Sequence, residues 1–286
     1  MARSVILGFF DGVHTGHRAV INSALDSACG GEVILVTLKN SPSLYFNGSY
    51  EYILPRHKSY EKIKSLGVND IIELEFGDFV SMSAIDFIKY IKDKFCPNYI
   101  VSGFNHTFGF NKSGTPELLK AKEAEFGYRY VYVPPMIIDD EIVSSSLIKQ
   151  CLKIGNIEKA NSLLESEFEL GGTVIHGVKI GRTIGFPTAN IIYPDNIVEI
   201  PYGVYAVDCI LDGNIKRAIM NWGMKPTVND NLEPVLEVHV PNFCGDLYDR
   251  NINVKVLKRI RGESKFGDLS ELREQIKKDV ELCLES

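Results

Sequence analysis

The cysteines of this sequence are scattered, and their spacing forms no pattern. The six cysteines lie at positions 29, 96, 151, 209, 244 and 283, with no C-x-x-C pair among them. Regular cysteine spacing is the usual sign of a disulfide framework or a zinc site, and neither is expected here. The cysteines are therefore predicted to be free thiols, which fits a reducing, cytoplasmic location.

Long apolar runs and runs of basic residues are missing as well. No stretch approaches the roughly 18 apolar residues that a membrane-spanning helix requires, and the apolar segment in residues 1–10 has no cleavage-like site behind it. The formal net charge of −6 gives no electrostatic reason for binding a polyanion. We therefore expect neither a membrane nor a nucleic-acid partner, whereas local basic groups remain able to bind nucleotides.

The first half of the chain alternates between two kinds of periodicity. Hydrophobic residues make up 45% of the 286 positions, enough for one large or two ordinary domains. Segments typical of buried strands occur at residues 4–8, 33–38, 70–74, 99–102 and 130–133, and helical patterns at 17–28, 60–66, 84–94 and 116–126. This alternation predicts an α/β, doubly wound parallel sheet with helices on both faces.

Beyond about residue 165 the pattern changes to glycines and short β-branched runs. These runs occupy residues 171–176, 203–211, 215–221, 236–240 and 253–260, and an amphipathic helix is expected at 269–282. They indicate an antiparallel barrel or sandwich. Residues 146–165 are expected to be helical, so we place the domain boundary near residue 165, giving domains 1–165 and 166–286.

The turn after the first expected strand is a candidate phosphate site. Residues 8–17 read GFFDGVHTGH, which places His14 and His17 at the start of a helix. Glycines such as Gly8 and Gly16 let the backbone approach a phosphate, and a helix N-terminus offers unpaired N–H groups. The two histidines could donate hydrogen bonds to phosphate oxygens in a transition state. The alternative is two incidental histidines near a helix cap.

A serine-rich segment later in the same domain is a second candidate. Residues 144–149 read SSSLIK, so Ser144 and Ser145 precede a cation, Lys149, at the start of an expected helix. Hydroxyls and a cation in this arrangement suit a phosphate. Taken alone, the segment is better explained as an ordinary serine N-cap.

The second half contains one segment with several potential ligand residues. Residues 181–190 read GRTIGFPTAN. Gly181 and Arg182 could wrap around phosphates, and Pro187 leads into Thr188 and Asn190. The neutral oxygens of those last two side chains suit octahedral Mg²⁺ together with substrate phosphates and water. No G-K-[ST] follows, so this is not a Walker loop, and a plain hairpin turn remains the alternative.

A carboxylate in a strand of alternating character could serve as a base. Glu237 lies in residues 236–240, LEVHV, and is expected to face inward with Leu236 and Val238 packed on the other side. A surface glutamate in a cross-strand pair is the alternative.

These phrases, in this order, resemble those of prokaryotic bifunctional riboflavin kinase/FAD synthetases. The first half resembles their adenylyltransferase module, of the nucleotidyltransferase superfamily, and residues 181–190 match the G-R-x-x-G-F-P-T-A-N signature of riboflavin kinases. Further short matches follow in family order up to Arg261 and residues 265–266. The resemblance implies a nucleotidyltransferase domain joined to a six-stranded antiparallel barrel with a C-terminal helix.

The same resemblance implies roles for the residues above. His14 and His17 would hold the phosphates of ATP, with contacts from Gly8, Phe9, Asp11, Gly16, Ser144, Ser145 and Lys149. Glu237 would deprotonate the ribityl 5′-hydroxyl of riboflavin, Thr188 and Asn190 would bind Mg²⁺, and Arg261 would lie in a loop over the flavin. ATP, riboflavin and FMN would be the substrates. A solvated cation before the last helix is the alternative for Arg261.

The sequence departs from the family pattern at three places in the first domain. A T-F-x-P-H-P-like stretch is replaced by residues 37–42, TLKNSP, so that Ser41 takes the histidine position. A G-x-D-F-x-F-G stretch is replaced by residues 103–109, GFNHTFG, where Asn105 is the candidate flavin-binding residue. Lys149 replaces an arginine and loses its bidentate fork. Two alternatives therefore stay open: a monofunctional riboflavin kinase with a degenerate adenylyltransferase domain, and a non-catalytic flavin-sensing regulator.

Overall fold

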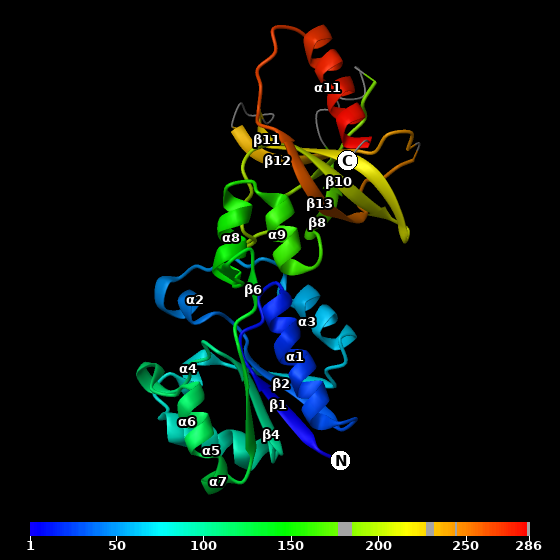
Figure 1. The fold of residues 1–286 in the computed structure, drawn as a ribbon. Coiled ribbons are helices and arrows are strands. Elements are labelled where there is room, and N and C mark those ends of the chain that lie inside the picture. The colour runs from blue at the N-terminus through cyan, green and yellow to red at the C-terminus, as the bar shows by residue number, and fades with distance from the viewer. Residues whose placement is uncertain (177–184, 227–231, 244, 285–286) are drawn as a thin grey trace. The chain divides into compact units, whose positions relative to one another are not determined.

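The chain folds into two compact units. The computed structural model describes residues 1–176, 185–226, 232–243 and 245–284. Contacts divide the chain into unit 1, Met1–Ser145, and unit 2, Ser146–Ser286, whose elements are labelled in Figure 1. This division falls before the helices of residues 146–165, whereas the boundary near residue 165 stays a prediction.

Unit 1 is built on a five-stranded sheet in which every neighbouring pair is parallel. The strand order is β3-β2-β1-β4-β5. The strands are β1 (Arg3–Leu7), β2 (Glu32–Leu38), β3 (Asp70–Leu74), β4 (Tyr99–Gly103) and β5 (Arg129–Val133). The doubly wound sheet predicted from the sequence is confirmed, and β1 lies at its centre, where the order reverses toward β4.

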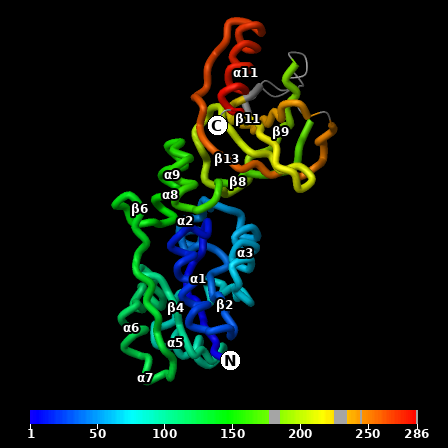
Figure 2. Tube along the Cα trace, turned by 45° about the vertical axis from the view of Figure 1, so that its right-hand side comes forward, coloured from blue at the N-terminus to red at the C-terminus, as the bar shows by residue number. Residues whose placement is uncertain are grey.

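Helices cover both faces of this sheet because successive strand residues point to opposite sides. Ile6, Val33 and Leu35 pack with α1 (Thr15–Ala28) and α3 (Arg56–Ser65), and the alternate residues of the same strands pack with the helices of the other face. Those helices are α5 (Ala84–Phe95), α6 (Pro116–Ala121) and α7 (Glu123–Phe126). Figure 2 shows α1 and α3 together, apart from α6 and α7.

Several short elements were not predicted. They are α2 (Pro42–Asn47), α4 (Phe76–Phe79), the 3₁₀ turn Phe110–Lys112 and the hairpin of β6 (Ile137–Ile138) with β7 (Glu141–Ile142). The single helix expected at residues 116–126 is wrong: it breaks into α6 and α7 because Lys122 leaves helical geometry, at φ −97° and ψ 2°.

Unit 2 is a closed six-stranded antiparallel barrel, in the order β10-β11-β12-β9-β8-β13. This outcome confirms the barrel and excludes the sandwich. Its strands are β8 (Phe168–Ile175), β9 (Ala189–Ile191), β10 (Gly203–Leu211), β11 (Asn214–Pro226), β12 (Leu232–His239) and β13 (Asn251–Arg261). The short strand β9 was missed in the sequence, although the number of strands was predicted correctly.

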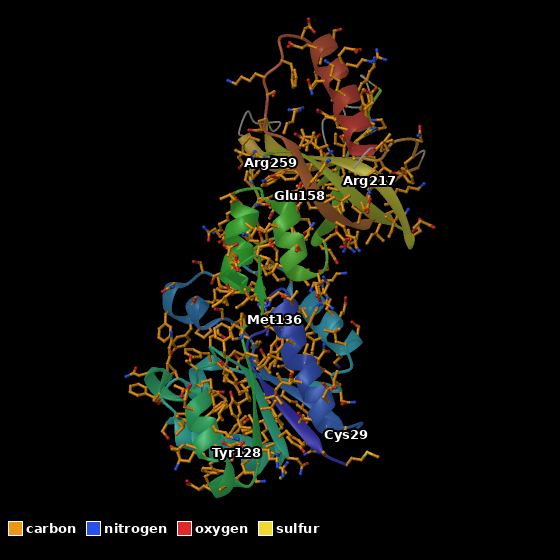
Figure 3. The ribbon with its side chains drawn as sticks, in the orientation of Figure 1. Cys29, Tyr128, Met136, Glu158, Arg217 and Arg259 are labelled. Carbon is orange, nitrogen blue, oxygen red and sulfur yellow. The ribbon has the colours of Figure 1, made fainter. Side chains whose placement is uncertain are left out.

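Among the described residues, three helices flank the barrel strands along the chain. α8 (Ser145–Lys153) and α9 (Ile157–Leu164) precede it, and α11 (Leu269–Leu284) follows it. Cys283 of α11 is buried and its thiol lies 3.0 Å from the carbonyl of Ala218. Arg217, labelled in Figure 3, pairs with Asp208 at 2.8 Å and also donates to the carbonyl of Cys283. Within the described ranges, no helix is both long and apolar enough to cross a membrane.

Candidate active sites

The turn after β1 is fixed by a buried carboxylate. The Asp11 side chain accepts hydrogen bonds from the backbone N–H of Ile53, at 2.8 Å, and from the hydroxyl of Tyr50, at 2.9 Å. Gly12 has φ +82°, and a Cβ there would lie 3.0 Å from the Ile53 side chain, so the turn needs glycine at this position. Asp11 therefore holds the backbone that leads to the histidines, and its carboxylate is engaged within the protein.

His14 and His17 meet at the N-terminus of α1. His14 is the N-cap residue, and its Nδ1 accepts the backbone N–H of His17 at 3.3 Å. The two rings stack with centroids 3.6 Å apart, and His17 also stacks on Phe10 at 4.5 Å. Because Nδ1 is an acceptor, neutral His14 carries its proton on Nε2 and can donate there. The spacing in the sequence thus brings both histidines together at a helix N-terminus.

Burial keeps these imidazoles uncharged at neutral pH. It lowers the pKa of His14 to about 4. The pKa of His17 is lowered well below its usual value, first by burial and then by the neighbouring His14. The pair therefore offers neutral hydrogen-bond donors beside a helix dipole, which suits oxygens that gain negative charge during a reaction.

The serine-rich segment reaches the same turn. Ser145 is the first residue of α8, and its hydroxyl donates to the backbone carbonyl of Asp11 at 3.1 Å. Ser144 directly precedes the helix, and Lys149 follows one turn later along it. The contact of Ser145 with Asp11 joins two segments that the sequence separates by more than a hundred residues.

The loop after β4 lies at the same edge of the sheet, because β4 runs parallel beside β1. Asn105 is exposed in this loop. His106 packs against Phe108, with ring centroids 5.6 Å apart, and burial lowers its pKa to about 4. Its Nε2 is shielded from solvent and has no hydrogen-bond partner among the described residues.

In unit 2, the barrel places Glu237 and Asn190 on one face. The two residues are directly opposed across β12 and β9, and Asn221 of β11 is opposed to Glu237 on its other side. The Thr188 hydroxyl lies 3.4 Å from Oε1 of Glu237. Thr188, Asn190 and Glu237, predicted from separate stretches of sequence, are thus brought together.

Glu237 was expected to face inward, and this expectation is wrong. Leu236 and Val238 are the residues that point into the barrel, with 0% and 1% exposure, so the alternation turns the half-buried Glu237 to the outer face. Asn221 was not predicted as a site residue, since only the strand register shows that it adjoins Glu237.

A pocket opens beside Thr188. It is lined by barrel residues and by the loop before β13, among them Val174, Ala189, Val238, Asp246 and Tyr248. Tyr248 stacks on His176 with ring centroids 4.0 Å apart. The carbonyl of Pro187 bonds Nδ1 of His239 at 2.8 Å, which anchors the segment leading to Thr188. Gly181 and Arg182, predicted as phosphate ligands, lie outside the described residues.

Arg261 is the last residue of β13 and forms an ion pair with a residue of α11. Its Nη2 lies 2.7 Å from Oδ2 of Asp279, and its Nε is 3.1 Å from both carboxylate oxygens. Asp279 is almost fully buried and also accepts from Gln275 at 2.8 Å. The predicted loop position is wrong, and contact with flavin stays a prediction.

Comparison with known proteins assigns both units. The FAD synthetase family matches residues 2–147 and the riboflavin kinase family matches residues 164–286. The bifunctional riboflavin kinase/FMN adenylyltransferase of Bacillus subtilis is 35% identical over 97% of this chain and 90% of its own length. The protein of that description from Escherichia coli is 32% identical over 96% and 89%.

A solved structure supports the fold over nearly the whole chain. A protein from Streptococcus pneumoniae described as a macrolide-efflux protein is 33% identical, with a TM-score of 0.90, and the match covers 99% of this chain and 93% of that one. The efflux description belongs to that protein alone. Because both family matches and the full-length relatives agree, this chain belongs to the bifunctional riboflavin kinase/FMN adenylyltransferase family.

Proposed function

We propose that this protein phosphorylates riboflavin to FMN with ATP in unit 2 and converts FMN with a second ATP to FAD and pyrophosphate in unit 1. The observation that carries the proposal is that each unit has its own chemically suited site. One is the His14–His17 pair at the start of α1, and the other is the Thr188–Asn190–Glu237 group on the barrel. Both lie within the regions matched by the two families.

For the kinase reaction, Glu237 is the proposed general base. It would accept the proton of the ribityl 5′-hydroxyl as that oxygen attacks the γ-phosphorus of ATP and ADP leaves. Asn221 and Asn190 flank Glu237 in the strand register and would orient its carboxylate or the substrate hydroxyl. The pocket beside Thr188 is the proposed place for the nucleotide.

Family membership implies ATP-dependent catalysis, which generally uses a divalent metal, and we propose Mg²⁺. The donors present fit this ion, since a hydroxyl, an amide carbonyl and a carboxylate are all oxygen ligands. Thr188 and Asn190 would hold it, with the remaining ligands from phosphates and water. When bound, the ion would neutralise charge on the ATP phosphates.

For adenylyl transfer, unit 1 would act by positioning and by stabilising charge. A phosphate oxygen of FMN attacks the α-phosphorus of ATP, and the bond to pyrophosphate breaks. The Nε2–H of His14, together with His17 and the first N–H groups of α1, would donate hydrogen bonds to the phosphate oxygens that gain charge. Ser144, Ser145 and Lys149 are the proposed additional contacts to the ATP phosphates. The free thiols fit a cytoplasmic location for both reactions.

Product analysis tests this proposal. Purified protein incubated with riboflavin and Mg-ATP should yield FMN first and FAD later, resolved by chromatography. FMN without FAD would contradict adenylyl transfer and indicate a monofunctional kinase, and no product would indicate a flavin-binding regulator.

A further inference from the structure

Arg56 occupies an unusual position beside the turn that carries the histidines. Its guanidinium carbon lies 4.6 Å from the centre of the Phe9 ring and 4.7 Å from that of Tyr60. Its Nη2 donates to the carbonyl of Leu38 at 2.7 Å, at the end of β2. The cation is therefore held between two rings at the carboxyl edge of β1 and β2, the edge where parallel α/β sheets bind ligands.

Much of the hydrogen-bonding capacity of this guanidinium is unused. Nη2 makes the contacts to Thr37, Leu38 and Tyr60, whereas Nε and Nη1 are shielded from solvent and have no hydrogen-bond partner in the part of the chain that the structure describes. Within that part, no carboxylate forms an ion pair with Arg56 either. Unsatisfied donors on a shielded cation lower the stability of the folded protein. An acceptor that binds to the cation during function would satisfy these donors.

The N-terminus of α3, which begins at Arg56, indicates that the acceptor carries a negative charge. The first turn of α3 holds Arg56, His57 and Lys58 and no acidic residue, and Pro55 makes no side-chain cap. Cations at a helix N-terminus oppose the helix dipole, and uncapped N–H groups there favour an anion. An anion beside Arg56 would satisfy the guanidinium and the helix together.

We propose that Arg56 binds the phosphate of the acceptor flavin during adenylyl transfer. The inference rests on the function proposed for unit 1. That reaction brings together two anionic substrates, and the His14–His17 pair at α1 is assigned to the triphosphate. Arg56 lies against Phe9, at a second helix N-terminus, and provides a separate cation for a phosphate monoester.

The test is steady-state kinetics of FAD formation in the full chain with Arg56→Met, which keeps the packed stem, and Arg56→Lys, which keeps the charge. Loss of a charge-assisted contact should raise the KM for FMN about 10- to 100-fold in Arg56→Met, with a smaller rise in Arg56→Lys. The KM for ATP should stay close to that of the parent protein. Thermal denaturation of each variant separates a kinetic change from unfolding.

Arg3→Met is the matched control. Arg3 is another part-buried arginine of unit 1, paired with Glu32 at the opposite end of β1, so its loss should leave both KM values unchanged. A rise confined to the KM for ATP would overturn the assignment to the acceptor phosphate. Unchanged KM values in folded Arg56→Met would overturn the anion site itself, while the parent protein's FAD synthesis would still support the proposed function.

Discussion

Glu237 owes its environment to the register of three strands. Asn221 and Asn190 flank it, and the Thr188 hydroxyl lies 3.4 Å away. Replacing Glu237 with Gln keeps the shape and removes the base, so kcat for FMN formation should fall by roughly 10² to 10⁴. ATP affinity, measured by calorimetric titration, should change little. The control is Glu199→Gln, an exposed glutamate of the same unit, and a Glu237→Gln protein with parental turnover would refute the role of Glu237.

His106 makes unit 1 sensitive to acid. Burial lowers its folded-state pKa to about 4 from the ordinary value of 6.5, so the unfolded chain binds the proton more readily. This contribution to stability is present above pH 6.5 and is lost as the pH falls toward 4, by about 3 kcal/mol at most. His106→Phe removes the titrating group.

Urea denaturation at pH 7.5 and pH 5 checks this prediction. His106→Phe should lose less stability between the two pH values than the parent protein does. An identical loss would show that other groups, such as the buried His14 and His17, account for the acid sensitivity of this unit.

For single residues, the sequence predicted sites that depend on local spacing better than sites that depend on contacts between distant segments. The H-x-G-H spacing was enough to bring His14 and His17 to one helix terminus, because residues three positions apart are neighbours on a helix. Arg56 was missed because its sequence neighbourhood is ordinary. Tyr60 lies one turn further along the same helix, but only the tertiary structure brings Phe9 to Arg56.

An ion pair with a buried carboxylate joins β13 to α11, together with an apolar cluster against which Ile260 and Val280 pack. Arg261→Met would leave the buried Asp279 without its counter-ion, which should destabilise the barrel unit by about 3–5 kcal/mol. The double change Arg261→Met with Asp279→Leu replaces the pair by apolar groups and should recover much of that loss. Thermal denaturation of the three proteins measures this.

The same double variant tests the predicted flavin contact of Arg261. If Arg261 also binds flavin, the folded double variant should show a raised KM for riboflavin. A normal KM in that stable protein would assign Arg261 to positioning α11 alone.

α9 belongs to the packing of the barrel. Ile157, Ala160 and Leu163 are fully buried, and Asn161 bonds the carbonyl of Val256 and the N–H of Phe168, both at 2.8 Å. A fragment of residues 146–286 should therefore fold and make FMN, whereas residues 166–286 should be less stable by several kcal/mol. Comparing their melting temperatures and FMN yields decides the boundary, and equal stability would favour a division near residue 165.

Strands and helices were predictable from the sequence where their hydrophobic pattern extends over many residues. Strands β10 and β13 and helix α11 have sustained patterns and were found close to their observed bounds. β9 has only three residues and follows directly after Pro187 and Thr188, so no alternation could reveal it. Its pairing with β12 and β8 is nevertheless what closes the barrel and places Asn190 opposite Glu237.

At the scale of the whole molecule, the central residues of the two reactions lie in different units, with the histidine pair in unit 1 and Glu237 in unit 2. The sequence predicted this division from two distinct periodicities. It could not predict the strand registers that assemble each site, because those depend on contacts between residues far apart in the chain.

The most direct test of this account is a crossed comparison of two variants of the full chain, with products resolved by chromatography. Glu237→Gln should make almost no FMN from riboflavin, yet should convert supplied FMN and Mg-ATP to FAD. The double change His14→Ala and His17→Ala should make FMN at the parental rate and no FAD. Loss of both products in either folded variant, or FAD formation that survives the loss of both histidines, would contradict the assignment of one reaction to each unit.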